Sequence, residues 1–344
     1  MRSNHLVALT ASVLAVTSTV ASAAEPLRVS VWGGSWRDTV AETVGEKFTE
    51  ETGVEVEYVT GGTMDRLNRA QLAKGDPETD ITFTTSHVGW LYANSGLFQE
   101  LDPERIPNAA SMFEEGRISE HHYGAWSYVY TIGYRPDMLP EGVTFDSWED
   151  LWSPELEGMI ALPDFDPSHI IAVSAMLEGA DIENWREGTE RLKALRPNIK
   201  SYYSSDGTSQ QGMQSGDTPV QVLLSGNAFH QMDEGVPIEL VIPEEGAVVG
   251  IDTVAINAGT ERTELAYEFI NYLYDPEVQA EIAELKKLGP MNPDAEVPED
   301  IASLPGVFTT PEEWEEDAFI IDHQQRAQLL SEWKEWFTTE MTGM

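Results

Sequence analysis

Cysteine is absent from the sequence of 344 residues. This absence excludes disulfide bonds, cysteine-ligated metal sites and a lipid anchor on an N-terminal cysteine, so burial of apolar side chains must stabilise the fold. Basic residues are also scarce: 20 Lys and Arg stand against 60 Asp and Glu, for a net charge of −40. Nucleic acids and anionic lipid surfaces are bound mainly through Lys and Arg, so the composition argues against both as partners.

The excess of acidic residues has a second consequence, which concerns salt. Like charges on one surface repel one another, and added salt screens that repulsion. We therefore expect the fold to be least stable at low ionic strength. A charge so far from neutrality favours a marine or otherwise saline source for the protein.

Long apolar runs are confined to the N-terminus, where Leu6 to Val20 follow the basic Arg2. The run is too short to span a bilayer, which takes about 20 apolar residues, and Ala21-Ser22-Ala23 supplies the small side chains that signal peptidases recognise. We interpret residues 1–23 as a secretory signal peptide cleaved between Ala23 and Ala24. The alternative is an uncleaved membrane anchor. The remaining chain is long enough for two domains.

Signatures of catalysis are missing as well. The sequence has no Gly-x-Ser-x-Gly motif, no His-Glu-x-x-His helix, no Gly-x-Gly-x-x-Gly after its first predicted strand and no phosphate-binding loop. The pair His121-His122 is expected in a solvated turn, because adjacent side chains rarely converge on one metal. With 60 carboxylates, no carboxylate pair is informative by itself. We therefore predict that the protein is not an enzyme and has no metal and no cofactor.

The segment after the signal peptide alternates predicted strands and helices. Alternating apolar residues predict strands at 27–32, 54–59 and 80–84, and helical apolar spacing predicts helices at 38–51 and 64–74. This order is typical of a parallel sheet with helices on its faces. Because such sheets bind ligands at the carboxyl ends of their strands, we expect a site near residues 32–36, 60–62 and 85–87.

Two later extended runs, 126–134 and 248–256, are candidates for strands that cross between two lobes. We predict a first lobe of residues 24–128 and 252–298 and a second lobe of residues 129–251 and 299–344. Further strands are predicted at 159–162, 220–224 and 238–242, and further helices at 169–177, 185–194, 209–214, 264–274, 276–287 and 311–338.

Several short segments, each weak by itself, together indicate a family. They are Val31-Trp32, Phe48 to Val56, Asp80, Ser147 to Glu155 with Gly158, Ser225 to Phe229, Pro243 to Gly246 and Ile251 to Ile256. In this order they resemble the substrate-binding proteins of ABC importers, in the branch that includes the periplasmic spermidine and putrescine binders. The resemblance implies an α/β fold of the two-lobed periplasmic binding proteins (type II). Each lobe would be a mainly parallel sheet flanked by helices, with the ligand cleft between the lobes.

The resemblance also implies how such a protein works. It would be a monomer in the periplasm that closes by a hinge on its ligand, and an ABC permease at the inner membrane would recognise the closed form. The ligand would be a small cationic or zwitterionic amine. The alternatives are an exported enzyme on a similar α/β scaffold and a binder of an aminophosphonate or a metal ion. Tyr202-Tyr203 resembles the adjacent tyrosines of ferric-ion binders, but alternation along a strand would point them apart.

Candidate ligand-binding residues follow from the same resemblance. Polyamine binders surround an alkylammonium chain with aromatic rings and bind its ends with carboxylates. Trp32 matches a ring of this box, Asp252 matches the main carboxylate, and Thr85 and Ser205 match polar contacts. Trp36 and Ser86 adjoin the same strand ends and join the set. Three alternatives stay open: Trp32 as a core aromatic, Trp36 packed on its own helix, and Asp252 paired with an Arg of the protein.

Other positions depart from the polyamine binders. Their second pair of carboxylates falls at Phe165 and Ser168, beside Asp164 and Asp166, which we include as candidates. Three rings of the aromatic box fall at Leu224, Gly250 and Gly289. One carboxylate and fewer rings suit a shorter ligand with a single cationic group, such as an ω-amino acid. A shift of one residue in the alignment would restore Asp164 or Asp166, and with them a polyamine.

Overall fold

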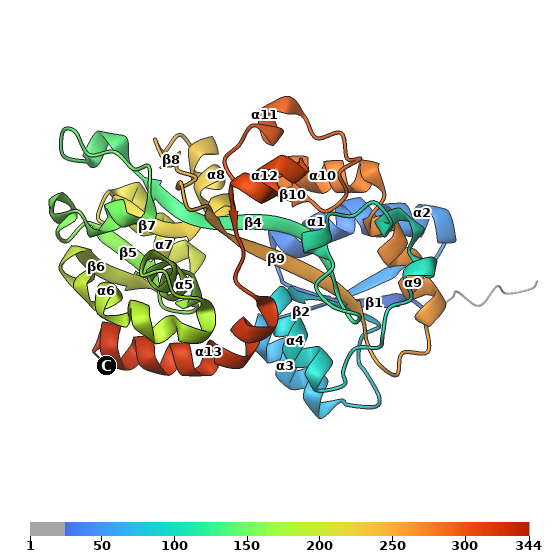
Figure 1. Ribbon diagram of the computed structural model, residues 1–344. Helices are drawn as coiled ribbons and strands as arrows, with labels where there is room; N and C mark the ends of the chain where they lie inside the picture. The colour runs from blue at the N-terminus through green and yellow to red at the C-terminus, as the bar shows by residue number, and fades with distance from the viewer. Residues whose placement is uncertain (1–24, 344) are drawn as a thin grey trace, which may run out of the picture.

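The computed structural model describes residues 25–343, so the predicted signal peptide at 1–23 lies outside the described residues. Within 25–343, no helix is long and apolar enough to cross a membrane. The described chain forms two lobes around one mixed sheet, whose strands follow the order β2-β1-β3-β9-β4-β7-β5-β6 (Figure 1). The predicted two-lobed α/β class is confirmed.

The first lobe begins with the predicted alternation of strands and helices. β1 (Leu27–Val31) pairs in parallel with β2 (Val56–Thr60) on one side and with β3 (Ile81–Thr85) on the other. Its helices are α1 (Ser35–Val40) and α2 (Glu46–Thr52), joined by a π-helical turn (Ala41–Gly45), and α3 (Thr63–Leu72), α4 (Ser86–Asn94), α9 (Thr263–Leu273) and α10 (Pro276–Lys286). The predicted strand ends therefore meet at one edge of the sheet.

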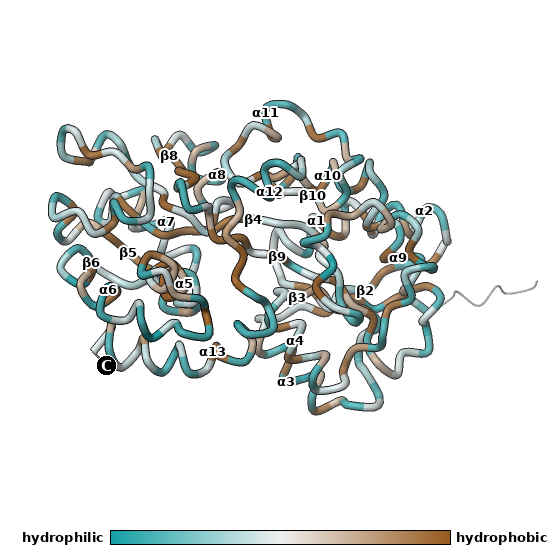
Figure 2. The backbone as a smooth tube through the Cα atoms, viewed as in Figure 1, coloured by the Kyte–Doolittle hydropathy of each residue, from teal (hydrophilic) through white to brown (hydrophobic). Residues whose placement is uncertain are grey.

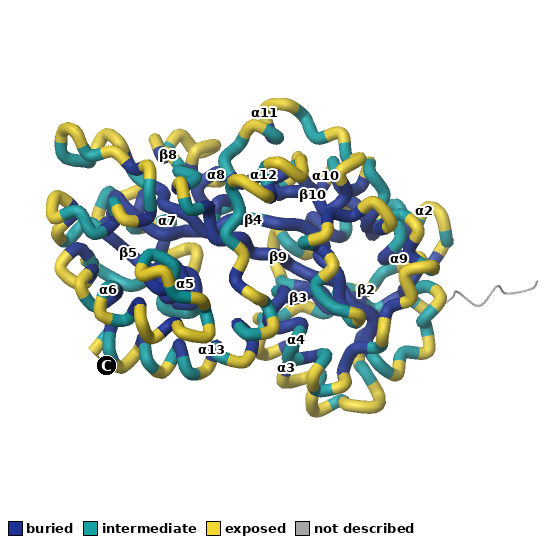
Figure 3. Tube along the Cα trace, in the orientation of Figure 1, coloured by how far each residue is buried: buried dark blue, intermediate teal, exposed yellow. Residues whose placement is uncertain are grey.

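Two long strands join the lobes. β4 (Tyr123–Tyr134) and β9 (Ala247–Ile256) run antiparallel, with Tyr123 opposite Val254 and Tyr130 opposite Val248. β9 pairs with β3 of the first lobe, and β4 pairs with β7 (Val220–Leu224) of the second. Both strands are buried through the middle of the molecule (Figure 3). The extended runs predicted at 126–134 and 248–256 are these crossing strands.

The second lobe repeats the layered arrangement. β5 (Ile160–Pro163) lies between β6 (Ile199–Tyr203) and β7 and is parallel to both. Its helices are α5 (Ser168–Leu177), α6 (Thr189–Ala194), α7 (Asp206–Ser215), α8 (Ser225–Asp233) and α13 (His323–Phe337). The short elements outside this arrangement are the strands β8 (Glu239–Leu240), β10 (Gly289–Pro290) and β11 (Ala318–Phe319) and the helices α11 (Glu299–Ala302) and α12 (Pro311–Glu316), and Trp314 of α12 packs into the first core.

The remaining turns of helix are short. The 3-10 helices are Pro103–Arg105, Pro107–Ala109, Glu114–Gly116, Pro136–Met138, Trp148–Trp152, Pro154–Leu156, Ile182–Gly188 and Arg196–Asn198, and a π-helical turn (Thr338–Thr342) follows α13.

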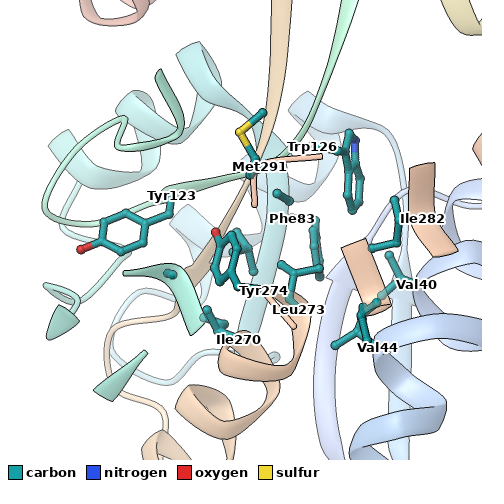
Figure 4. Close-up of a cluster of buried hydrophobic side chains, with 14 of the residues drawn as sticks. Val40, Val44, Phe83, Tyr123, Trp126, Ile270, Leu273, Tyr274, Ile282 and Met291 are labelled. Carbon is teal, nitrogen blue, oxygen red and sulfur yellow. The ribbon is translucent and has the colours of Figure 1, made fainter. Parts of the chain in front are cut away.

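Each lobe has its own apolar core. Figure 4 shows part of the first core, in which Val44, Phe83, Leu273 and Trp126 come from separate elements. The second core includes three buried indoles. They are Trp148, Trp185 and Trp333. Figure 2 shows the same division along the chain, with hydrophobic residues inside the lobes and hydrophilic residues on the outer helices.

The C-terminal part of the chain differs from its prediction in two ways. The helix predicted at 311–338 is interrupted by β11, because Ala318 and Phe319 pair with the start of β9. Gly246 makes this approach possible: its φ is +89°, and a Cβ there would lie 2.9 Å from the backbone nitrogen of Phe319. In addition, Phe308 and Trp314 pack into the first core, although the predicted bounds assign residues 299–344 to the second lobe. As a whole, the domain bounds stay a prediction.

Ion pairs on the surface leave most of the acidic residues without a partner. Basic residues are so few that single ones contact two acids, as Lys193 does with Glu190 and Glu340 and Arg191 does with Glu149 and Glu178. Exposed pairs of this kind contribute little to stability. With a net charge of −40, the acidic side chains therefore repel one another across both lobes.

We expect the melting temperature to rise with added NaCl. The Debye length falls from about 30 Å at 0.01 M to about 3 Å at 1 M salt, so screening removes repulsion between charges on different elements. Most of the rise should come below about 0.15 M, where charges about 8 Å apart become screened. A thermal melt followed by circular dichroism across this range checks it. A flat or falling curve would show that the repulsion does not limit stability.

Candidate functional site

Two hollows lie between the lobes. The Trp36 hollow, of about 680 Å³, is lined by residues of α1 and α10 from the first lobe and of α7 and α8 from the second. The Arg326 hollow, of about 320 Å³, is lined by the start of α3, Thr85 and the start of α4 from the first lobe, and by α5 and α13 from the second. Tyr128 and Tyr130 of β4 also line the Arg326 hollow. Both hollows thus depend on side chains from both lobes.

A row of aromatic side chains lies along β4. Trp126, Tyr128 and Tyr130 share one face of the strand, because side chains alternate along a strand. Trp126 stacks on Phe83 and on Trp36, with ring centroids 5.5 and 5.8 Å apart. Tyr130 stacks on the imidazole of His169 at 3.8 Å. The row therefore runs from the first core to the wall of the Arg326 hollow.

The carboxylate of Asp252 lies beside this aromatic row. β9 places Asp252 opposite Trp126 of β4 and opposite Thr85 of β3, and only 3% of the residue is exposed. Trp126 Nε1 donates a hydrogen bond to Oδ2 at 2.9 Å, and the Tyr128 hydroxyl donates to Oδ1 at 3.2 Å. Both donors are neutral groups, so each oxygen of the carboxylate accepts one hydrogen bond but neither donor compensates its charge.

Burial raises the pKa of Asp252 to about 7. Desolvation of the charged form is the main cause, and it outweighs the hydrogen bonds from Trp126 and Tyr128 and the more distant charge of Arg66. Arg66 is not a direct partner, because its guanidinium donates to acceptors elsewhere. They are Gly61 O, Ser30 Oγ and Phe83 O. No Arg among the described residues forms an ion pair with Asp252, so the alternative of a paired Arg has no direct contact behind it, although the charge of Arg66 still lowers the pKa of Asp252.

Tyr128 occupies space that Gly250 leaves open. A Cβ on Gly250 would lie 2.1 Å from Cε2 of the Tyr128 ring. The room at Gly250, where the resemblance led us to expect an aromatic residue, is therefore taken by a ring of the neighbouring strand. Leu224 lines the Trp36 hollow without adding a ring, and a Cβ on Gly289 would meet Ser127 Oγ at 2.2 Å.

The two predicted indoles already have partners. Trp32 is half-buried, its Nε1 donates to Thr63 Oγ1 at 2.8 Å, and the guanidinium of Arg66 lies 4.8 Å from its ring centroid. Trp36 lines the hollow named after it, and Lys286 Nζ lies 4.4 Å from its ring centroid. Trp36 thus holds a cation of the protein itself on its ring. Trp32 lines neither hollow, so its role as a ligand contact stays a prediction.

Asp166 lines the Arg326 hollow, but its charge is compensated. Arg326 Nη2 donates to Oδ2 at 2.8 Å, and the backbone nitrogen and hydroxyl of Ser168 donate to Oδ1 at 3.1 and 2.6 Å. The charge of Arg326 and the hydrogen bond from Ser168 hold the pKa of Asp166 well below its usual range, against the effect of burial. A second ammonium group of a ligand would find this carboxylate already paired.

The other predicted residues are divided between the cleft and its surroundings. Thr85 lines the Arg326 hollow. Ser86, the first residue of α4, lies 2.9 Å from His323 Nδ1 of α13 and so links the two lobes. Ser205 is exposed and caps α7 through Thr208, and Asp164 is half-buried with its backbone nitrogen bonded to Tyr203. Asp164 and Ser205 line neither hollow, as is also true of Asp252, so the roles of all three as ligand contacts stay predictions.

The tyrosine pair and His122 are hydrogen-bonded within the protein. Among residues 25–343, no group of three or more His, Asp or Glu side chains is placed to hold a metal ion. Tyr202 donates to Met341 O and Tyr203 donates to Val222 O, so the two hydroxyls point apart as predicted. The solvated turn predicted for His121-His122 is wrong for His122, which is buried and bonded to Ser119 Oγ and Ser86 O.

Sequence reasoning did not name Trp126, Tyr128, Tyr130 or Arg326 as contributors to the site. Tyr128 and Tyr130 could have been found, because the run from Trp126 alternates aromatic residues on one strand face. Arg326 gives no such signal, since its contact with Asp166 joins residues 160 positions apart.

The raised pKa of Asp252 predicts an unusual effect of Asp252→Asn on stability. Below about pH 7 the folded protein keeps a proton on this carboxyl that the unfolded chain, with an ordinary pKa near 4, has lost. The contribution of the group to the free energy of unfolding therefore falls as pH rises from about 4 to about 7. We expect Asp252→Asn to be more stable than the parent at about pH 8, by an amount on the order of 1–4 kcal/mol.

Urea unfolding at about pH 8 and about pH 5 measures the effect. The gain should shrink at the lower pH, where the parent carboxyl is also neutral. Asp164→Asn, at a half-buried aspartate outside both hollows, is the control and should show no comparable gain. A destabilised Asp252→Asn at both pH values would mean that the ionised carboxylate stabilises the fold.

Comparison with known proteins identifies relatives of the chain. The profile of the family described as bacterial extracellular solute-binding protein matches residues 43–309. The spermidine/putrescine-binding periplasmic protein of Salmonella typhimurium is 27% identical over 293 residues, which cover 82% of each chain. The putrescine-binding periplasmic protein of Escherichia coli is 27% identical over 305 residues, covering 80% of this chain and 81% of that one.

Solved structures extend the likeness to the whole fold. The crystal structure of an ABC transporter from Clostridium perfringens superposes with a TM-score of 0.80 at 28% identity and covers 92% of this chain and 99% of that one. The family profile spans most of the sequence, from residue 43 to residue 309 of 344. The chain therefore belongs to the bacterial extracellular solute-binding protein family.

Proposed function

We propose that the protein is the periplasmic solute-binding component of an ABC transporter and that it captures a small amine-bearing molecule between its lobes. The observation that carries the proposal is Asp252, a carboxylate buried where the lobes meet and contacted only by neutral donors among the described residues. A ligand ammonium would supply the missing positive charge through a charge-assisted hydrogen bond. The names of the relatives, which are spermidine and putrescine binders, support an amine.

The aromatic row gives the amine its second contact. Tyr128 lies in the Arg326 hollow with its hydroxyl on Asp252, and this 3.2 Å hydrogen bond is the longer of the two that the carboxylate accepts. An entering ammonium displaces this hydroxyl and comes to lie against the ring of Tyr128. Cation–π attraction of this kind contributes about 0.5–2 kcal/mol. On binding, the ammonium group thus loses its hydration and gains contacts with a carboxylate and an aromatic ring.

Capture then couples to closure of the lobes. Contacts between the lobes already include Ser86 with His323 and an ion pair of Lys287 with Asp233. A ligand that touches β9, β4 and the second lobe at once adds contacts that only the closed form offers, so it shifts the population to that form. The ABC permease would recognise the closed form. Binding and release need no bond to be made or broken, so the protein would act as a monomeric carrier rather than an enzyme.

Asp252→Asn tests the proposal by removing the charge and keeping the shape. Losing one partner of a buried ion pair costs about 3–5 kcal/mol, so the affinity for amines should fall by about 100-fold or more. Trp32→Leu should cost less than about 30-fold, in line with a cation–π contact. Isothermal titration calorimetry with putrescine, spermidine and 4-aminobutyrate measures both variants against the parent.

Asp217→Asn serves as the matched control, because Asp217 is exposed and paired with Lys200 away from both hollows. Its removal changes the net charge by the same amount and should leave affinity unchanged. If Asp252→Asn binds every amine as tightly as the parent, the carboxylate is structural and the proposal fails.

A further inference from the structure

Three polar atoms of the Arg326 hollow lack a hydrogen-bond partner among the described residues. They are Thr85 Oγ1, His87 Nδ1 and Arg326 Nε, and each belongs to a residue that lines this hollow. Arg326 and His87 are only 4% and 6% exposed. Buried polar groups are nearly always hydrogen-bonded, so three unsatisfied ones around one hollow indicate a missing partner. The Nε–H of an arginine can only donate, so the partner must carry an acceptor.

Arg326 has a hydrogen-bond donor without an acceptor within residues 25–343, whereas both oxygens of its partner Asp166 accept hydrogen bonds. Arg326 reaches Asp166 and His169 Nε2 through Nη2 alone, at 2.8 and 3.0 Å. Asp166 accepts from Arg326 on one oxygen and from Ser168 on the other. A guanidinium binds a carboxylate best through two parallel hydrogen bonds. In Arg326 the Nε–H donor of such a pair has no acceptor in the described part of the chain.

The charges that line the hollow favour an anion as well. Asp166 is its one carboxylate among the described residues, and two cationic side chains, Arg326 and Lys334, also line it. The imidazoles add no charge at neutral pH, because burial and the charge of Arg326 lower the pKa of His169 to about 3 and that of His87 well below its usual range. A second ammonium group would therefore meet a local excess of positive charge.

The two ends of the site are adjacent. Thr85 lies opposite Asp252 in the pairing of β3 with β9, and Tyr128 contacts both Asp252 and the hollow. We infer that the Arg326 hollow binds a carboxylate of the ligand through Arg326 Nε, Thr85 Oγ1 and His87 Nδ1, while Asp252 binds the ammonium of the same molecule. The ligand is then a zwitterion of the ω-amino acid class rather than a diamine. This inference rests on the proposed function, because it takes the ammonium at Asp252 as given.

Three probes with the same amine and different far ends separate the possibilities. In 4-aminobutyrate, putrescine and n-butylamine the far end is a carboxylate, an ammonium and a methyl group. We expect calorimetry on the full protein to give 4-aminobutyrate, or a longer member of the series up to 6-aminohexanoate, an affinity at least about tenfold above both the diamine of matched length and n-butylamine.

Variants then assign the preference to the hollow. Arg326→Gln combined with Asp166→Asn keeps the local charge balanced, and it should lower the affinity for the ω-amino acid by about 30-fold or more while changing that for n-butylamine less than about threefold. Thr85→Val leaves every charge in place and should lower the affinity for the ω-amino acid by about fivefold. This variant therefore tests the site even if the double variant does not fold. Arg186→Gln with Glu332→Gln, an exposed pair that also involves α13, is the matched control and should change nothing.

The outcomes separate this inference from the proposed function. Tighter binding of the diamine, still dependent on Asp252, overturns the carboxylate subsite and leaves amine capture standing. An ω-amino acid preference that survives both the double variant and Thr85→Val also overturns the assignment to this hollow. Failure of all the probes, the diamines and n-butylamine included, overturns both.

Discussion

The buried carboxylate of Asp252 is the constraint on which the site depends. Its charge is held where the lobes meet, and the described side chains that contact it are an indole and a phenol, both neutral. Desolvation of the charged form raises the pKa of Asp252 to about 7. Near neutral pH the carboxyl of the free protein is therefore partly protonated, and a nearby positive charge is enough to ionise it fully. A ligand that brings a positive charge offsets the desolvation free energy of the buried carboxylate.

The crossing strands explain why the carboxylate lies there. β4 and β9 are the longest strands, and because they belong to both lobes they place Trp126, Tyr128 and Asp252 at the boundary independently of either core. Gly250 on β9 leaves the room that the Tyr128 ring fills. The second lobe then adds the open fork of Arg326 from α13, opposite the end of β3. Cation and anion subsites therefore come from different elements joined by one strand pair.

The local sequence pattern predicted the strands well, but it did not predict which charged side chains pair with one another. Alternating apolar residues are enough to place β1, β3 and the two crossing strands, because each buries one or both faces. Asp252 followed from the family resemblance. The neutralisation of Asp166 by Arg326, the burial of His122 and the pairing of β11 with β9 depend on contacts between distant parts of the chain, which no local pattern records.

A carbon-13 NMR titration of the Asp252 carboxyl tests the central claim most directly. In the free protein the account predicts an apparent pKa near 7, well above that of an exposed aspartate. Saturation with an amine that binds should lower this pKa by about two units or more, because the ammonium stabilises the charged form. A free-protein pKa near 4, or a pKa that does not move when the amine binds, would contradict the account.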